Sequence, residues 1–325
     1  MHSTALTATA VDAPTEPAEG GRPVARPARR RTPRGALPYA LVLPALAALC
    51  VGLGYPLARQ LVLSFQDYGL AQQFGQPAPW VGLDNYRALV DDTYLWSLVL
   101  RSVLFCFFCA GVTMAVGVGI ALLLRLMSTT VRLLVQTALL LAWAMPVLAV
   151  LTVWQWLFDS QYGVINWTLT RLGGDFAGHP WLLEPLSFFL VAAIVVVWMS
   201  VPFVAFTVYA GLTQVPEELL EAAEVDGADA RSRLRHIILP VIRPVLLVVG
   251  LLQVIWDLRV FTQIYVLQKA GGVTADTNLL GTYIYRSGIG EGRFGTAAAV
   301  AVFMLVLTIV LTSPYVVRML REEES

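Results

Sequence analysis

Residues 221–244 read EAAEVDGADARSRLRHIILPVIRP, the most hydrophilic stretch in the second half of an otherwise strongly apolar chain. Just upstream, Pro216 opens a helix in whose first turn its missing N–H does no harm, and acidic residues follow it. Gly227 permits a turn that a residue with a side chain resists. Asp229 is placed to cap a second helix, which runs on to Pro240. The pattern predicts a helix, a glycine turn and a second helix that leads back into an apolar segment.

The composition of the whole chain is that of a membrane protein. Of the 325 residues, 57% are hydrophobic and only 14% are charged, whereas about a quarter of the residues in an ordinary soluble domain are charged. A polytopic membrane protein is therefore the expected class. The formal net charge is zero, which argues against nucleic acid as a partner because phosphate binding needs a basic face.

Enzymatic sites are not apparent in the sequence. Lys269 is the only lysine and lies outside any Gly-Lys-Ser/Thr context, so the chain has no phosphate-binding P-loop of its own. Cys106 and Cys109 have C-x-x-C spacing inside an uncharged run, where a packing role is favoured over a redox or metal role. The three histidines are scattered. We expect no catalytic residue, no metal site and no cofactor on this chain.

Apolar windows predict six membrane-spanning helices. A helix needs about 20 apolar residues to cross the hydrocarbon core. The windows that reach this length are Ala36–Ala58, Ser102–Leu124, Leu133–Phe158, Pro185–Val215, Pro244–Gln268 and Gly295–Val317. We therefore predict an all-α permease domain over residues 36–322. The arginine- and proline-rich residues 1–35 are expected to be a disordered cytoplasmic tail, and residues 323–325 to be a cytoplasmic C-terminus.

Basic residues near the span ends predict the orientation. If the N-terminal tail is cytoplasmic, 14 of the 22 basic residues fall on the same side, as the positive-inside rule requires. Both termini and the hydrophilic loop over residues 216–236 are then cytoplasmic. The protein is expected in the cytoplasmic membrane as a multi-pass chain.

The loop carries a family signature. Residue physics alone leaves open an ordinary amphipathic loop, but the order Glu-Ala-Ala, three residues, Gly, nine residues, Ile-x-Leu-Pro resembles the EAA signature of bacterial ABC importer permeases. The positions are Glu221, Ala222, Ala223, Asp226, Gly227, Ile237, Leu239 and Pro240. The resemblance implies the type I importer fold and a coupling helix that docks on a separate ATPase subunit. That partner, and not this chain, would bind ATP and Mg²⁺.

Four further stretches resemble the carbohydrate branch of the same family. They are WVGLDNYRALVDD (80–92), GLTQVPEELLEAAEVDGA (211–228), IYVLQKAGG (264–272) and FGTAAAV (294–300). Members of this branch import disaccharides, oligosaccharides or glycerol phosphates, and we expect import of a disaccharide or oligosaccharide across a bacterial cell membrane. The resemblance also implies the partners: a second, homologous permease, two ATPase subunits and an extracellular, lipid-anchored sugar-binding protein.

Polar residues inside the fifth window mark a candidate substrate path, because ionisable groups within a span usually face a cavity or the bundle interior. The candidates are Gln253, Trp256, Asp257, Arg259, Phe261 and Gln263, with Trp143 from the third window. Spacing of four residues places Gln253, Asp257 and Phe261 on one helical stripe. Aromatic faces beside amides and charged groups suit a sugar. A structural pairing of Asp257 with Arg259 or with neighbouring subunits is the alternative.

The third window also contains features that predict local structure. Pro146 is expected to kink the helix. Trp154 and Trp156, near its outer end, are more typical of anchors at the membrane interface than of sugar-stacking residues.

A secondary transporter driven by ions is the alternative function. It would be expected to contain internal repeats and acidic residues in several spans, whereas Asp257 is the only acidic residue within a predicted span. An intramembrane enzyme would need a catalytic or metal constellation that the sequence lacks.

Overall fold

The computed structural model describes residues 36–323, so the predicted tail at 1–35 and the last two residues lie outside the described part. The described residues divide into two compact units, residues 36–54 and 55–323. In the first unit, α1 (Ala36–Leu49) leads into a π-helical turn, η1 (Cys50–Gly54). Its described side chains are exposed, as expected of a helix that meets lipid or another subunit.

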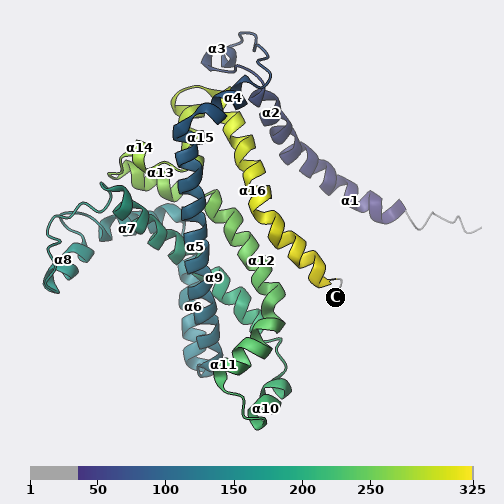
Figure 1. Cartoon of the computed structure of the whole chain (residues 1–325), viewed down its shortest axis with the longest axis vertical. Coiled ribbons are helices and arrows are strands. Elements are labelled where there is room, and N and C mark those ends of the chain that lie inside the picture. Colours follow the sequence, from purple (N-terminus) through teal and green to yellow (C-terminus); the bar gives the residue numbers. More distant parts are fainter. Residues whose placement is uncertain (1–35, 324–325) are drawn as a thin grey trace, which may run out of the picture. The chain divides into compact units, whose positions relative to one another are not determined.

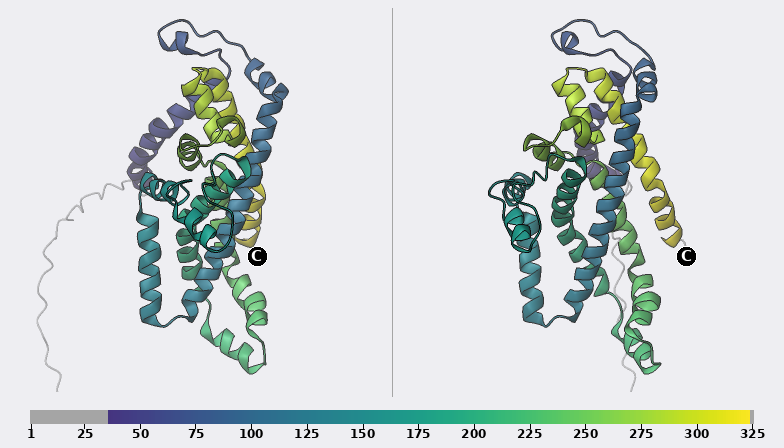
Figure 2. Two further views of the ribbon diagram at one scale, coloured as in Figure 1. Left: turned by 90° about the vertical axis from the view of Figure 1, so that its left-hand side faces the viewer. Right: turned by 60° about the vertical axis from the view of Figure 1, so that its left-hand side comes forward.

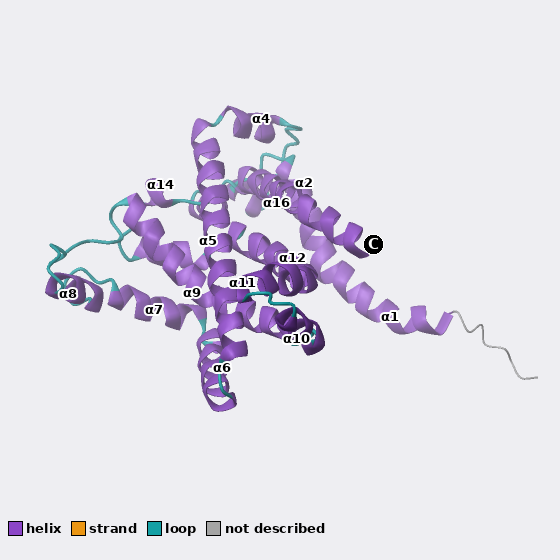
Figure 3. Cartoon of the chain, turned by 60° about the horizontal axis from the view of Figure 1, so that its bottom comes forward, coloured by secondary structure: helices purple, strands orange, loops and turns teal. Residues whose placement is uncertain are grey.

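The second unit is built from helices and the turns that join them (Figures 1 and 3). Within residues 55–323 the exception is one isolated antiparallel bridge between Gln66 and Trp80. The helices are α2 (Tyr55–Ser64), α3 (Leu70–Gln73), α4 (Asp84–Asp91), α5 (Thr93–Leu126), α6 (Thr129–Ala144), α7 (Val147–Leu157), α8 (Val164–Arg171), α9 (Pro185–Leu212), α10 (Glu217–Val225), α11 (Ala230–Arg233), η2 (Leu234–Ile238), α12 (Leu239–Leu258), α13 (Thr262–Lys269), α14 (Thr274–Thr277), α15 (Leu280–Tyr285), η3 (Arg286–Gly290) and α16 (Phe294–Glu323).

Five helical runs of the described chain are long and apolar enough to cross a membrane, and a bent pair of helices makes a sixth if it counts as one span. The five are Leu41–Ser64, Thr93–Leu126, Pro185–Leu212, Ala230–Lys269 and Phe294–Arg321. The all-α class is therefore confirmed. The second span begins earlier than predicted, because Thr93 follows the N-cap residue Asp92, whose carboxylate accepts the N–H of Tyr94.

The third window is not the continuous span that we predicted. It splits into α6 and α7, which meet at an angle of 99°. Met145 and Pro146 lie between them with extended backbone, because proline has no N–H to donate and disfavours a helical residue before it. The expected kink is thus a full break, typical of a broken span or a re-entrant loop.

The fifth window is also interrupted. The helix α12 ends at Leu258, and α13 begins only at Thr262. Figure 1 shows α13 beyond the end of α12 and beside α7. Phe261 is therefore not on a continuous stripe with Gln253 and Asp257, and this part of the prediction was wrong.

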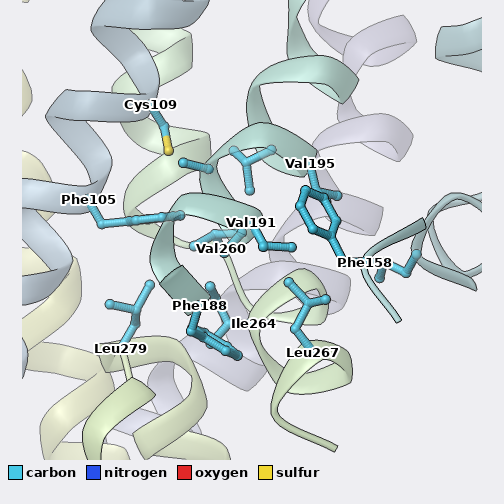
Figure 4. Close-up of a cluster of buried hydrophobic side chains, with 14 of the residues drawn as sticks. Phe105, Cys109, Phe158, Phe188, Val191, Val195, Val260, Ile264, Leu267 and Leu279 are labelled. Atoms are coloured by element: carbon cyan, nitrogen blue, oxygen red, sulfur yellow. The ribbon is translucent and has the colours of Figure 1, made fainter. Parts of the chain in front are cut away.

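Close packing of α5 against α9 forms the centre of the second unit. At Gly117 a Cβ atom would come within 2.6 Å of the Val204 side chain, so only glycine allows the two helices this separation. Further along α9, a buried cluster around Phe188, Val191 and Val195 receives Phe105 from α5 and residues of α7 and α13 (Figure 4). This cluster fixes α7 and α13 to the central pair.

Candidate functional site

The hydrophilic stretch folds as predicted, as a helix, a turn and a second helix. Pro216 is the N-cap of α10, and Glu217 and Glu218 occupy the first turn, where acidic side chains favour the helix dipole. Figure 2 shows this loop at the same end of the unit as the turn between α5 and α6. Both therefore lie on one side of the membrane.

The turn after α10 explains the spacing of the motif. Gly227 has φ +81°, the left-handed region that glycine adopts at little cost. Its N–H donates to the Glu224 carbonyl at 3.0 Å, and the N–H of Ala228 donates to the Ala223 carbonyl at 2.9 Å. These two bonds form the Schellman end of a helix, in which a glycine follows the C-cap residue, here Asp226. The segment from Ala223 to Ala228 is thus one hydrogen-bonded unit.

The second helix is tied to the first by capping and charge. The Asp229 carboxylate accepts the N–H of Ser232 at 2.8 Å, which confirms the predicted N-cap. Arg233 Nη1 lies 2.6 Å from Glu224 Oε2, so an ion pair crosses the turn. The Glu224 side chain is exposed and that of Arg233 is partly exposed, so the pair contributes at most about 1 kcal/mol to the stability of the loop. It acts together with the Asp229 cap and the Gly227 turn.

The apolar end of the motif anchors the loop to the bundle. Ile237 and Leu239 are partly buried and pack against a buried cluster at this end of α9 and α12. The cluster includes Leu212, Val215 and Ile242. Pro240 lies in the first turn of α12, where its missing N–H is tolerated. The Ile-x-Leu-Pro positions therefore serve as the base of the loop.

Several side chains of α10 are exposed in the described part of the chain. Glu221 and Ala222 are exposed, and Ala223 is half-buried. Leu219 and Val225 are 50% and 89% exposed, which sequence reasoning did not single out. Two exposed apolar side chains on a short acidic helix could have been found from their positions either side of the Glu-Ala-Ala motif.

The predicted path residues separate into a buried pair and an exposed group. Gln253 Nε2 donates to both carboxylate oxygens of Asp257 at 3.0 Å, and both side chains are buried. The helix α12 lies against α5 and α16 as well as α9. Asp257 therefore pairs with Gln253, not with Arg259, which is exposed at the end of α12.

A group of aromatic rings gathers beyond the break in the fifth span. Phe261 stacks on Tyr265 with ring centroids 5.3 Å apart, and Tyr285 from α15 meets both rings at 5.2 and 5.0 Å. The Lys269 ammonium lies 4.8 Å from the centre of the Tyr265 ring. Sequence reasoning missed Tyr285, because this residue lies 20 positions after Tyr265 and 24 after Phe261 in the sequence. We call Phe261, Tyr265 and Tyr285 the aromatic triad.

The remaining candidates lie elsewhere. Trp256 is 46% exposed and makes an edge contact with Phe203 of α9. The Gln263 amide approaches the Met199 sulfur at 3.9 Å. Trp143, at the end of α6, is about half exposed, and it makes no ring contact with the aromatic triad in the described chain.

Trp154 and Trp156 were both expected to be anchors at the membrane interface, but Trp154 packs against other helices of the unit. It is partly buried, stacks on Phe158 and makes an edge contact with Trp198 of α9. This tryptophan therefore packs α7 into the unit. Trp156, two residues on, is 55% exposed.

A cleft of about 500 Å³ lies beside α7, with Trp156, Trp181 and Asp159 in its wall. The Asp159 carboxylate accepts the backbone N–H groups of Gln161 and Tyr162 at 2.8 Å. These hydrogen bonds, from Tyr162 first and then Gln161, hold the pKa of Asp159 below its ordinary value, since they favour the charged form. The cleft thus combines aromatic surface with a fixed carboxylate.

Comparison with known protein families matches residues 92–317 to the binding-protein-dependent transport system inner membrane component family. This range covers more than two thirds of the chain and includes the loop, the buried pair and the aromatic triad. The chain belongs to this family. As an inner membrane component it is a multi-pass permease of an ABC importer, and the secondary-transporter alternative is not favoured.

Relatives of known name extend the match beyond the family range. The inner membrane component is 40% identical to the diacetylchitobiose uptake system permease protein DasB of Streptomyces coelicolor, over 94% of each chain. It is 33% identical to the trehalose/maltose transport system permease protein MalF of Thermococcus litoralis, over 84% of this chain and 90% of the relative. These similarities span the permease domain.

Solved structures confirm the importer fold of this inner membrane component. A chain of a bacterial ABC transporter involved in the import of the acidic polysaccharide alginate superimposes with a TM-score of 0.72. The match covers 88% of this chain and 95% of the other at 24% identity. At that identity the likeness concerns the fold alone.

Proposed function

We propose that this inner membrane component is one of two permease subunits of an ATP-driven importer for a disaccharide or oligosaccharide. The observation that carries the proposal is the 40% identity over 94% of the chain to a diacetylchitobiose uptake permease. Relatives named for sulfoquinovosyl glycerol and for trehalose/maltose transport support the same substrate class. Each of these substrates contains a sugar unit.

The loop over residues 216–236 is the proposed contact with a separate ATPase subunit. The exposed face of α10, with Glu221, Ala222, Leu219 and Val225, would enter a groove of that subunit as an amphipathic helix does. ATP and Mg²⁺ would be bound there, so this chain would need no cofactor of its own. A second homologous permease and another ATPase subunit complete the proposed complex.

The proposed transport cycle converts closure of the ATPase pair into movement of the two permeases. Closure would draw the two loops together and rock the helices between inward- and outward-facing arrangements, a rigid-body change of the hinge type. An extracellular, lipid-anchored binding protein would deliver the sugar on the opposite side. The loop and both termini are then cytoplasmic.

The aromatic triad is the proposed sugar contact on this chain. Stacked rings cover the C–H faces of a pyranose, while nearby polar groups bond its hydroxyls. Arg259 and Lys269, both exposed, supply such groups close to the triad in sequence. Gln253 and Asp257 are buried and are assigned to holding α12 in place.

Uptake of radiolabelled N,N′-diacetylchitobiose and maltose by cells that carry or lack this gene tests the proposal. We expect uptake to require the gene and to stop when ATP is depleted. Uptake that persists without ATP and collapses with an uncoupler would contradict an ATP-driven importer. Uptake unchanged by loss of the gene, for every sugar in a panel, would contradict the substrate class.

Two variants of one residue test the sugar contact. Tyr285→Phe keeps the ring, and we expect near-normal uptake from it. Tyr285→Ala removes the ring, and a stacking contact worth about 1 kcal/mol corresponds to a roughly fivefold rise in the sugar concentration for half-maximal uptake. Equal kinetics for both variants would exclude the triad as a sugar contact.

A further inference from the structure

A polar cavity of about 500 Å³ lies at the end of the unit that carries the loop. Arg125 from the last turn of α5 and Arg132 from the first turns of α6 line one side. Tyr209 of α9 and the segment from Leu212 to Glu217 line the other. The cavity therefore joins the α5–α6 turn to the first residues of the loop.

The two arginines bring positive charge into this cavity, and neither forms an ion pair in the described part of the chain. Arg125 Nη1 is buried and has no hydrogen-bond partner in the described chain. Within residues 36–323, neither guanidinium lies within 4.0 Å of a carboxylate, since the ion pairs found there involve other residues. Glu217 contributes to the wall but pairs with neither arginine. A buried guanidinium nitrogen without a hydrogen-bond partner is costly, so an anionic acceptor from outside the chain would be stabilised here.

The surroundings indicate which anion fits. Leu126, next to Arg125, is 83% exposed, and Leu133 and Leu134, next to Arg132, are 63% and 67% exposed. Leucines exposed at the ends of membrane helices are suited to contact with acyl chains, and such contact would place the guanidinium groups at the depth of the lipid headgroups. Guanidinium matches phosphate in geometry and binds it through paired hydrogen bonds. Basic pockets between membrane helices on the cytoplasmic side bind anionic headgroups.

We propose that Arg125 and Arg132 hold the phosphate of an anionic phospholipid headgroup in this cavity. The acyl chains of the same lipid would run along the exposed leucines of α5 and α6. The bound phosphate would also lie near Thr213 and Gln214, whose hydroxyl and amide can donate hydrogen bonds to it, in the wall that leads directly into α10. The lipid would thus fix the start of the loop against the α5–α6 turn.

Native mass spectrometry of the full chain, purified with the subunits that accompany it, measures this binding. The probes are dioleoylphosphatidylglycerol, dioleoylphosphatidylcholine and inorganic phosphate. Arg125→Gln and Arg132→Gln are compared with Arg318→Gln, which removes an exposed arginine near the end of α16. A hydrogen bond to a charged group is strong enough that its loss weakens binding about tenfold or more.

We expect wild type and Arg318→Gln to retain phosphatidylglycerol in preference to phosphatidylcholine, and both cavity variants to lose that preference. Equal retention by wild type and both cavity variants would overturn the proposal. Binding of inorganic phosphate without retention of phosphatidylglycerol would identify a free-phosphate site and overturn the lipid assignment. Unchanged lipid retention with loss of the accompanying ATPase subunit would identify a protein contact instead. If Arg125→Gln does not fold, the lipid preference of Arg125→Lys and Arg132→Gln is compared with that of wild type as the test of the proposal.

Discussion

Replacing Gly227 by alanine tests whether the shape of the loop depends on its turn. The residue has φ +81°, and a Cβ atom built there meets no other atom within 4 Å. The cost of Gly227→Ala is therefore one of backbone conformation and not of crowding. For a residue with a side chain the left-handed conformation costs about 1–2 kcal/mol, which lowers the population of the closed turn about 5- to 30-fold relative to open forms.

Opening the turn would break the hydrogen bonds from Gly227 to Glu224 and from Ala228 to Ala223. We expect the amides of Gly227 and Ala228 to exchange hydrogen about 5- to 30-fold faster in Gly227→Ala. Sugar uptake should fall, while insertion into the membrane is retained. Gly227→Asn should lose less uptake than Gly227→Ala, because asparagine adopts the left-handed region more readily than alanine.

The control is the same substitution at Gly290, an exposed glycine without positive φ whose Cβ would make only an ordinary contact with Arg286. Gly290→Ala should leave both exchange in the loop and uptake unchanged. If Gly227→Ala gives the same exchange rates and the same uptake as Gly290→Ala, the turn is not what holds the loop in shape.

Three other substitutions or conditions have expected outcomes. Asp229→Ala removes the N-cap of α11 and should cost about 1 kcal/mol, seen as faster exchange of the Ser232 amide; unaltered exchange would contradict the cap. The lowered pKa of Asp159 means that its turn is stabilised above the ordinary carboxyl pKa of about 3.9. This stabilisation is lost as the pH falls through the lowered value, so Trp156 and Trp181 fluorescence should change only below about pH 4. Asp257→Ala leaves the buried Gln253 amide unpaired and should lower the free energy of unfolding by about 1–3 kcal/mol. The melting temperature of the full chain should therefore fall, and it should fall further in Asp257→Ala than in Asp257→Asn. Reduced uptake with an unchanged melting temperature would instead place Asp257 in the substrate path.

The loop could be predicted from the sequence because its shape is determined locally. Proline, glycine and aspartate each act on the backbone within a few residues, at Pro216, Gly227 and Asp229, and the structure confirms all three. The existence of the apolar segments could be predicted for a similar reason, since length and hydropathy identify segments that are able to cross a membrane.

The break at the end of α12 could not be predicted because it depends on a distant contact. Residues 259–261 contain neither glycine nor proline, so the local sequence favours a continuous helix. In the fold, Gly281 of α15 comes so close that a Cβ atom on it would lie 3.0 Å from the Val260 carbonyl oxygen. The same approach of α15 brings Tyr285 to Phe261. The aromatic triad was therefore missed for the same reason as the break.

The loop and the aromatic triad lie at the two ends of one helical element. From Ala230 the chain is helical through η2 and α12 as far as Leu258, and the 20 residues of α12 alone span about 30 Å. Its lower part is fixed by Ile237 and Leu239, and its upper part by the buried Gln253–Asp257 pair. Because the interruption comes only after Leu258, one continuous helix connects the loop to the residues just before the triad. Beyond the break, the contact of Phe261 with Tyr285 joins the end of this element to α15, so a displacement of the loop would be passed on to both helices at the triad.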